Sequence, residues 1–193
     1  RDLNLLLIDA EHGFGNGNLI PYGILREPAS QWTRADAIII TKANISSANS
    51  VSEILKNELK VNIPVFNFNF EAKLFCSLDG KNRKNIKHLA GKNLLIVSGI
   101  AQPDSFKKML ENHKGNIINH LEFADHHDYS NNDVQKILNK NAEIKPDYII
   151  TTEKDAVKLR RFSELKNSVW ILEIEVHPEE SWYPFFESYL DNL

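Results

Sequence analysis

Short apolar runs that end in polar residues recur along the chain, and they constrain its fold more than any other feature. They lie within residues 3–10, 36–41, 93–98 and 147–151, and Asp, Thr or Ser closes each one. A continuous apolar run of this length is typical of a strand covered on both faces, as in a parallel sheet. The closing polar residue marks the place where such a strand would meet a loop, and ligands of open α/β sheets bind at those ends.

Helical patterns separate the apolar runs. Pro103 predicts the first residue of a helix that ends near His113. Ser130, followed three residues later by Asp133, resembles a capping signal for another helix. Residues 47–59 have apolar residues near helical spacing and a possible Ser cap. Alternating strands and helices predict βαβ units, and therefore an α/β fold built on a parallel sheet.

Two further segments alternate strictly between apolar and polar residues. Period-2 alternation over residues 65–70 and 170–176 gives each strand one apolar face suited to burial and one polar face suited to solvent. We expect these strands to pair as a β hinge between a first domain and a smaller α/β domain. The expected division is 1–64 for the first domain, 65–78 for the hinge strand, 79–166 for the smaller domain, and 167–193 for the return strand and a terminal helix docking on the first domain.

Composition excludes several classes of protein. A net charge of −3 gives no electrostatic case for wrapping nucleic acid. Cys76 is the single cysteine, which excludes an internal disulfide and suits a reducing compartment. No apolar run approaches the roughly 20 residues needed to cross a bilayer. Because a core-type strand begins almost at Arg1, which is not Met, we expect an upstream portion of the protein to precede this chain.

The stretch from Asp125 to Tyr129 is the densest group of reactive side chains. Its five consecutive residues carry two carboxylates, two imidazoles and a phenol. A carboxylate can hold an imidazole tautomer while the other ring nitrogen takes a proton, so the stretch suits acid–base catalysis or metal binding. The alternative is a solvated loop after the strand predicted over residues 117–123.

Two segments near the N-terminus offer ligand-binding groups. Residues 12–18, which include Asn16, contain three glycines that permit close approach of the backbone to a ligand, although a bare turn explains them equally well. Arg26 can grip phosphate with two nitrogens, and Glu27 can bind Mg²⁺. A surface ion pair is the common alternative for an Arg-Glu dipeptide.

Two charged segments have ordinary explanations as well. Residues 151–159 read as a helix start capped by Thr151 or Thr152, with lysines that pair with nearby acids. The basic run of residues 81–88 is most often a solvated loop, but it could also face anionic lipid headgroups.

Taken together and in order, these segments resemble the tetraacyldisaccharide 4′-kinase family of lipid A biosynthesis, over nearly the whole chain. No single motif is decisive, whereas the ordered set is highly specific. The motifs are Arg1-Asp2-Leu3, Asp9-Ala10, Gly13-Phe14-Gly15-Asn16-Gly17 with Pro21, Leu25-Arg26-Glu27-Pro28, Ala35-Asp36, Gly99-Ile100-Ala101-Gln102-Pro103, Phe123-Ala124-Asp125-His126-His127-Asp128-Tyr129 and Thr152-Glu153-Lys154-Asp155-Ala156-Val157-Lys158.

The resemblance implies a P-loop-kinase-like sheet, of which residues 1–64 would be the remainder of the nucleotide-binding core. It implies transfer of the ATP γ-phosphoryl group, with Mg²⁺, to the 4′-hydroxyl of a lipid A disaccharide precursor. The implied location is peripheral, on the cytoplasmic face of the bacterial inner membrane. ATP and the lipid precursor are the implied partners.

The resemblance also assigns residues. His126 becomes the reacting histidine, with His127 as the alternative, and Asp125 the residue that orients it. Glu27 matches an acidic residue near the Mg-ATP site and is the candidate metal ligand. Ala124 departs from the Pro usual before Asp-His-His, which loosens the turn but removes no reacting group. The implied substrate- or nucleotide-binding residues are Arg26, Glu27, His127 and Asn16.

Parts of the family pattern are expected before Arg1, namely the phosphate loop, an acidic segment, and the Asp that acts with the histidine. We therefore expect the 193-residue chain alone to transfer no phosphate. Two alternatives stay open at this point. One is a metal-dependent phosphoesterase of the Asp-His-His type, which would use His and Asp to hold Mn²⁺. The other is a non-catalytic lipid-docking module.

Overall fold

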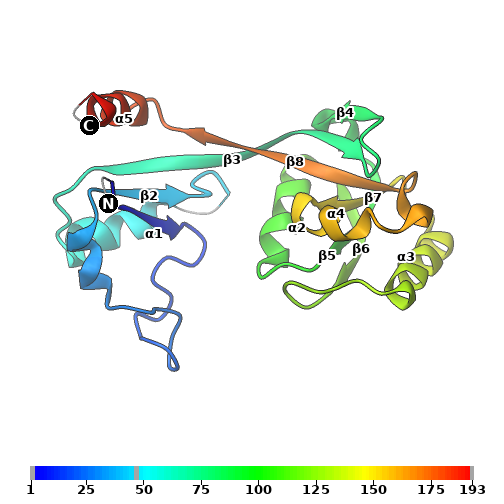
Figure 1. Cartoon of the computed structure of the whole chain (residues 1–193), viewed down its shortest axis with the longest axis horizontal. Coiled ribbons are helices and arrows are strands. Elements are labelled where there is room, and N and C mark those ends of the chain that lie inside the picture. The colour runs from blue at the N-terminus through cyan, green and yellow to red at the C-terminus, as the bar shows by residue number, and fades with distance from the viewer. Residues whose placement is uncertain (1–2, 46–47, 192–193) are drawn as a thin grey trace. The chain divides into compact units, whose positions relative to one another are not determined.

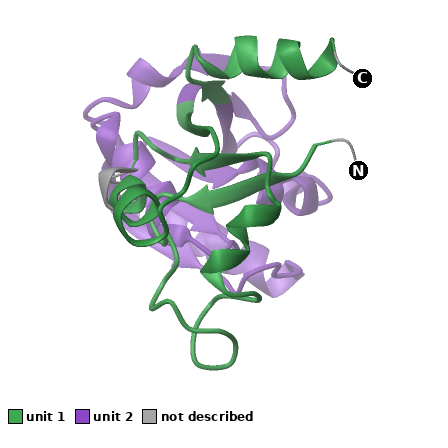
Figure 2. Ribbon diagram, turned by 90° about the vertical axis from the view of Figure 1, so that its left-hand side faces the viewer, with its two compact units in different colours: residues 1–71, 176–193 green, residues 72–175 purple. Residues whose placement is uncertain are grey.

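The computed structural model describes residues 3–45 and 48–191. The chain divides into two compact units, residues 1–71 with 176–193 and residues 72–175 (Figures 1 and 2). Strand β3 (Val65–Ser77) carries the chain from the first unit into the second, and β8 (Val169–Pro178) carries it back. These two strands are neighbours in hydrogen-bonding order, and both are longer than the alternating segments predicted.

The first unit contains a parallel sheet. Strand β1 (Leu5–Asp9) pairs in parallel with β2 (Ala37–Thr41), and β2 pairs in parallel with β3. A 3₁₀ helix (Ala29–Arg34) precedes β2, and helix α5 (Trp182–Leu190) closes the unit. Helix α1 (Ala48–Glu53) continues into a π-helical turn (Ile54–Glu58) instead of the single helix predicted over 47–59. The proposed Ser47 cap lies outside the described residues.

Side chains on the two faces of β2 define two cores in the first unit. Ile38 and Ile40 pack with Val51 and Leu55 on one face. On the other face, the Trp182 ring of α5 joins Ala37, Ile39 and Phe66, and it stacks on Phe186 with ring centroids 5.4 Å apart. Because β2 is buried on both faces, it matches the strand type that its continuous apolar run predicted.

Leu7 corrects the prediction for the neighbouring strand. Residues 3–10 were expected to form a strand covered on both faces, but the Leu7 side chain is 62% exposed. Among the described strands, β1 pairs with β2 alone, so it is an edge strand there. The described residues cover only part of Leu7, so the apolar run to which it belongs is only partly buried.

The second unit is the α/β domain in which the Asp125–Tyr129 stretch lies. Its parallel strands follow the order β8-β7-β5-β6, and a short strand, β4, pairs antiparallel with β3. Helices α3 and α4 pack on Leu95 and Val97 of β5. The predicted strands and their parallel pairing are confirmed. Figure 1 shows the helices around this sheet. The bounds are β4 Arg83–Asn85, β5 Asn93–Ser98, β6 Asn116–Glu122, β7 Tyr148–Thr152, α2 Pro103–Asn112, α3 Asn131–Ile144, α4 Glu153–Leu159, and 3₁₀ helices Ile86–Leu89 and Ser163–Leu165.

Local capping starts the helices where the sequence predicted. Pro103 occupies the first turn of α2. Ser130 and Asp133 form a reciprocal capping box at α3. Of the two threonines considered at α4, Thr152 is the cap, because its side chain accepts a hydrogen bond from the Asp155 amide. No helix in the described ranges is long and apolar enough to cross a membrane.

The boundaries between the two units fall inside β3 and β8, after residues 71 and 175. The hinge role expected for residues 65–78 and for the return strand within residues 167–193 stays a prediction. Strands β5, β6 and β7 run in parallel, so their carboxyl ends open onto the same edge of the sheet. The loops that follow these three ends form the candidate site.

Candidate active site

The loop after β6 holds His126 in a left-handed backbone conformation. The φ angle of His126 is +60°, which is uncommon for a residue with a side chain. Its amide donates to the Gly99 carbonyl at 3.1 Å, and the His127 amide donates to the Ala124 carbonyl at 3.0 Å. Such a conformation costs about 1–3 kcal/mol and persists where surrounding contacts impose it. The turn after β5 therefore fixes the direction in which the His126 ring projects.

The His126 ring is accessible and lies beside a lysine and a carboxylate. Its side chain is 72% exposed. The Lys154 Nζ atom lies 3.4 Å from His126 Nε2 and donates to Asp125 Oδ1 at 3.2 Å. The other oxygen of Asp125 lies 3.8 Å from His126 Nε2, beyond hydrogen-bond distance. Asp125 is therefore linked to His126 chiefly through the ammonium of Lys154.

The charges around Asp125 favour its ionised form. Desolvation pushes the pKa of Asp125 upward. The hydrogen bond from Lys154 and the charges of His126 and Lys154 outweigh that effect, so the pKa stays below its ordinary value. The loop therefore presents an ionised Asp125 carboxylate beside the side chains of Lys154 and His126.

His127 is packed, in contrast to its neighbour. Its ring stacks on Phe123 with centroids 4.8 Å apart and meets the Tyr129 ring edge-on at 5.1 Å. His127 Nε2 lies 3.1 Å from Asp133 Oδ2, which ties the loop to the first turn of α3. The two adjacent histidines thus differ in kind, because His127 holds the loop in place while His126 faces outward.

A buried carboxylate ties the turn after β5 to the start of α4. The fully buried Asp155 accepts hydrogen bonds through Oδ2 from the Gly99 amide at 3.0 Å and the Thr152 hydroxyl at 2.7 Å. A Cβ atom at Gly99 would lie 3.1 Å from Asp155 Oδ1, 3.2 Å from the Ala124 carbonyl oxygen and 3.2 Å from His127 Cβ. Glycine at this position lets three segments of the site meet.

The basic side chains after β7 reach the loop instead of pairing along their own helix. Lys158 Nζ donates to the His127 carbonyl at 2.7 Å. Arg161 pairs with Asp128 at 2.8 Å and also donates to the Tyr129 carbonyl. Sequence reasoning favoured an ordinary helix start here and did not select Lys154, Asp155 or Gly99 as site residues. The available signal was that both motifs directly follow predicted strands of one parallel sheet.

The remaining predicted site residues lie in the first unit. Asn16 makes its contacts within its own loop, donating to the Tyr22 carbonyl at 2.8 Å and accepting from the Asn18 amide at 3.1 Å. Arg26 is exposed. Glu27 pairs with Arg34, so the ion pair suggested for an Arg-Glu dipeptide forms with a different arginine. Glu27 also lines a cleft of about 420 Å³ beside the start of β1.

A second group of ligand-type side chains follows β1 and was not predicted. One ligand atom from each of Asp9, Glu11 and His12 lies within 4.8 Å of the others, and across residues 3–45 and 48–191 this is the one such group of three. Two carboxylates suit Mg²⁺, which prefers oxygen ligands. Lys42 Nζ already lies 2.7 Å from Asp9 Oδ2, so the fit to a cation is partial. Glu27 does not belong to this group.

Comparisons with known proteins agree on one family. The family model described as tetraacyldisaccharide-1-P 4′-kinase (LpxK) matches residues 1–191. The tetraacyldisaccharide 4′-kinase of Bdellovibrio bacteriovorus is 35% identical over 91% of this chain and 52% of its own length. That of Syntrophotalea carbinolica is 38% identical over 82% of this chain and 42% of its own length. This chain therefore spans about half the length of the curated relatives it matches.

A solved structure shares the fold. LpxK from Aquifex aeolicus, crystallised in complex with ATP, aligns with all of this chain and 52% of its own, with a TM-score of 0.64 and 23% identity. The predicted α/β class, with a kinase-like parallel sheet, is confirmed. The chain belongs to the tetraacyldisaccharide 4′-kinase (LpxK) family.

Proposed function

We propose that the whole protein transfers the γ-phosphoryl group of ATP to the 4′-hydroxyl of a tetraacyldisaccharide 1-phosphate, a precursor of lipid A. One observation carries the proposal for this chain. His126 is an exposed imidazole, held in a left-handed turn by Gly99 and placed beside Lys154 and Asp125, in a chain of this kinase family.

The residues of the loop suit the acceptor side of phosphoryl transfer. The 4′-oxygen bonds to the γ-phosphorus while the bond to the bridging oxygen of ADP breaks, and His126 takes the hydroxyl proton. Lys154 donates to an oxygen of the transferring group, where negative charge must be neutralised. Asp125 keeps the ammonium of Lys154 beside the imidazole. His127 holds the loop, and it is the weaker candidate for the reacting histidine.

ATP and Mg²⁺ complete the proposed reaction. When bound, Mg²⁺ neutralises phosphate charge. Glu27 is the ligand that the family resemblance suggests, and Asp9 and Glu11 are two further carboxylates of this chain that suit the ion. Asn16 and Arg26 stay candidates for nucleotide or substrate binding. Because a tetra-acylated substrate resides in a membrane, we place the protein peripherally on the cytoplasmic face of the bacterial inner membrane.

The 193-residue chain contains no Gly-x-x-x-x-Gly-Lys-Ser/Thr sequence that could cradle the β- and γ-phosphates. We therefore propose that this chain alone is inactive. Incubation with ATP, Mg²⁺ and the tetraacyldisaccharide 1-phosphate tests this directly, and formation of the 4′-phosphorylated product would contradict it.

The experiment that tests the proposed role of His126 uses the whole protein. Replacing His126 with Ala should lower kcat by about 10²–10⁴-fold, the usual contribution of a positioned proton acceptor, while the KM for ATP changes little. His88→Ala is the matched control, since His88 is an exposed histidine of the same unit outside the loop. An unchanged kcat in His126→Ala would remove His126 from the mechanism.

The phosphoesterase alternative has no support in the described geometry. A site of that type needs several metal ligands around the Asp-His-His triplet. Within the described ranges, the one group of three ligand-type residues is Asp9, Glu11 and His12, none of which belongs to the triplet. Manganese-dependent cleavage of phosphodiesters by this chain would support the phosphoesterase function instead.

A further inference from the structure

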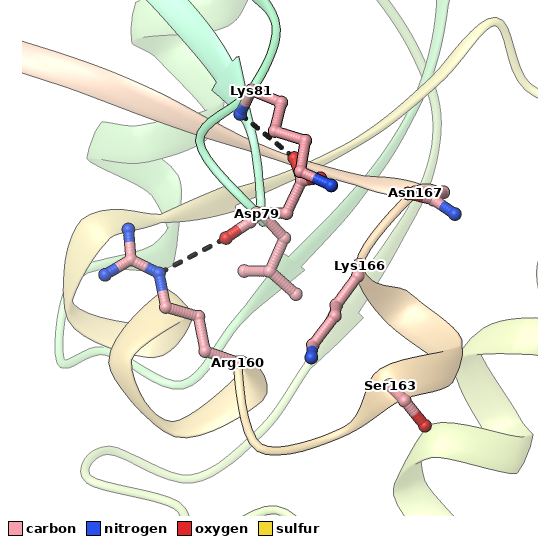
Figure 3. Close-up of a pocket in the computed structure, with 7 residues that line it drawn as sticks. Asp79, Lys81, Arg160, Ser163, Lys166 and Asn167 are labelled. Atoms are coloured by element: carbon pink, nitrogen blue, oxygen red, sulfur yellow. Dashed lines mark hydrogen bonds and ion pairs between the residues drawn. The ribbon is translucent and has the colours of Figure 1, made fainter.

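A cleft of about 720 Å³ lies in the second unit between the β3–β4 turn and the segment after α4 (Figure 3). Asp79 and Lys81 come from the turn, and Arg160, Ser163 and Lys166 come from the segment. This segment leads into the amino end of β8, whereas the His126 loop follows the carboxyl end of β6. The cleft is therefore built from other elements than the candidate active site.

Positive charge dominates the lining of the cleft. Lys81, Arg160 and Lys166 face one carboxylate, that of Asp79. Asp79 is already engaged, because its Oδ1 accepts from the Ser77 hydroxyl at 2.6 Å and the Lys81 amide at 3.1 Å. Its Oδ2 lies 3.6 Å from Lys81 Nζ. Three cations against one carboxylate leave an excess of positive charge.

Two of these cations have donors to spare. Arg160 Nε donates to the Leu78 carbonyl at 3.3 Å, which holds the guanidinium at the edge of the cleft. Neither terminal nitrogen of Arg160 makes a hydrogen bond or an ion pair with a described residue. The same holds for Lys166 Nζ. Figure 3 shows Arg160 and Lys166 on the segment after α4, with Lys81 on the turn.

The adjacent basic run contributes little to this cleft. Arg83 pairs with Glu173 at 3.2 Å, and Lys84 lies over the rings of Tyr148 and Trp170. Of residues 81–88, only Lys81 lines the cleft. The cleft is thus a discrete group of cations and differs from a general basic surface.

We propose that this cleft binds a phosphate-bearing anion. The planar fork of Arg160 matches two phosphate oxygens, and Lys166 adds a mobile point charge. The volume falls within the range for small-molecule sites and exceeds what one phosphate ion fills. Either a soluble phosphate compound or the phosphate headgroup of a membrane lipid has this chemistry. The proposal depends on neither ATP nor His126.

The test uses the 193-residue chain and two probes. Inorganic pyrophosphate, followed by isothermal titration, represents the soluble source. Phosphatidylcholine vesicles with and without phosphatidylglycerol, followed by co-sedimentation, represent the lipid source. The variant is Arg160→Gln with Lys166→Gln. The matched control is Lys107→Gln with Lys140→Gln, which removes the same charge from helices α2 and α3 of the same unit. The single variant Lys166→Gln removes no described side-chain contact, so it serves as the test variant if the double variant does not fold.

We expect the parent chain to bind one probe or both. The affinity should fall at least about tenfold in the cleft variant, because two cations near the anionic group are lost, and it should change little in the control. Binding to pyrophosphate identifies a soluble ligand, and binding confined to phosphatidylglycerol vesicles identifies a lipid headgroup. Equal losses in both double variants would show general charge attraction and overturn the proposal. Absence of binding to both probes would also overturn it.

Discussion

The Asp155 carboxylate accepts a hydrogen bond from the Gly99 amide at 3.0 Å, across 56 residues of sequence. Gly99 in turn accepts from the His126 amide through its carbonyl. A single buried side chain at the start of α4 thus fixes the turn that holds the exposed histidine. The position of His126 depends on this relationship as well as on its own loop.

Replacing Asp155 with Asn should destabilise the 193-residue chain. An amide oxygen in the place of Oδ2 can still accept both hydrogen bonds. The amide NH2 group then takes the buried position of Oδ1, which has no hydrogen-bond partner among the described residues, and the charge that strengthens both bonds is lost. We expect a loss of about 1–3 kcal/mol in the free energy of unfolding, measured by urea denaturation. Asp104→Asn is the control, because Asp104 is an exposed acid in the first turn of α2. Equal stability of the two variants would contradict the role given to Asp155.

The two adjacent histidines should respond differently to alanine. His127→Ala loses two aromatic contacts and the interaction with Asp133, so we expect a loss of about 1–2 kcal/mol in thermal or urea unfolding. His126→Ala should change stability by less than about 0.5 kcal/mol, because its ring is exposed. The reverse order of effects would show that His126 is the structural residue of the pair.

Removing the hydroxyl of Tyr129 should change stability little. Tyr129 is fully buried, and no described residue meets its hydroxyl at normal hydrogen-bond geometry. Burial, the negative charge of Asp155 and a side-chain interaction of the hydroxyl with the Asp155 carboxylate raise the pKa of Tyr129 far above its ordinary value, so the phenol stays neutral. Because this interaction offsets only part of the roughly 1–3 kcal/mol that an unpaired buried hydroxyl costs, Tyr129→Phe should change the free energy of unfolding by less than about 1 kcal/mol.

Tyr148→Phe is the control for that experiment. Its hydroxyl accepts from Lys84 Nζ at 2.9 Å, so its removal should lower the free energy of unfolding. If Tyr129→Phe is the more destabilising of the two, the interaction of the Tyr129 hydroxyl with Asp155 must be a full hydrogen bond.

Acid should weaken the attachment of the His127 loop to α3 over a defined range. Hydrogen bonds from the Ser130 amide and hydroxyl, with the His127 interaction, lower the pKa of Asp133 from 3.8 to about 2. A carboxyl group whose pKa is lower in the folded than in the unfolded state stabilises the fold at pH values above its unfolded-state pKa. This stabilisation is lost as the pH falls through the folded-state pKa. The contribution of Asp133 should therefore disappear between about pH 4 and pH 2.

Urea denaturation of the 193-residue chain at several acid pH values measures this effect. Asp133→Asn should be less stable than the parent at pH 7 and should vary less between pH 4 and pH 2. Asp128→Asn serves as the control, since the Asp128 carboxylate is well exposed. If the free energy of unfolding falls equally with pH in the parent and in Asp133→Asn, Asp133 is not the source of the acid-dependent loss of stability.

The elements of the second unit were predictable because their signals are local. Apolar runs specified β5 and β7, and Ser130 and Thr152 cap helices through contacts three residues away. Leu7 shows the limit of this reasoning. An apolar run predicts burial, but only the arrangement of neighbouring elements decides whether another segment covers it.

The candidate site was predictable in part. The sequence singled out Asp125, His126 and His127, but it could not tell the two histidines apart. The left-handed backbone at His126 lets its ring face outward while the ring of His127 packs inward. The hydrogen bond from the His126 amide to the Gly99 carbonyl helps to impose that conformation. Lys42 and Asp9, 33 residues apart, are likewise joined only by the pairing of β1 with β2.

The sequence by itself determined the α/β class, the helix starts, the dense Asp-His-His stretch and the family to which it belongs. Each of these depends on residues close together in the chain or on motifs in a fixed order. The tertiary structure decided which histidine faces outward, which lysine stands beside it, and which buried carboxylate holds the turn. Those choices depend on parallel strands bringing distant loops to one edge of a sheet, and local periodicity does not encode the side-chain contacts made there.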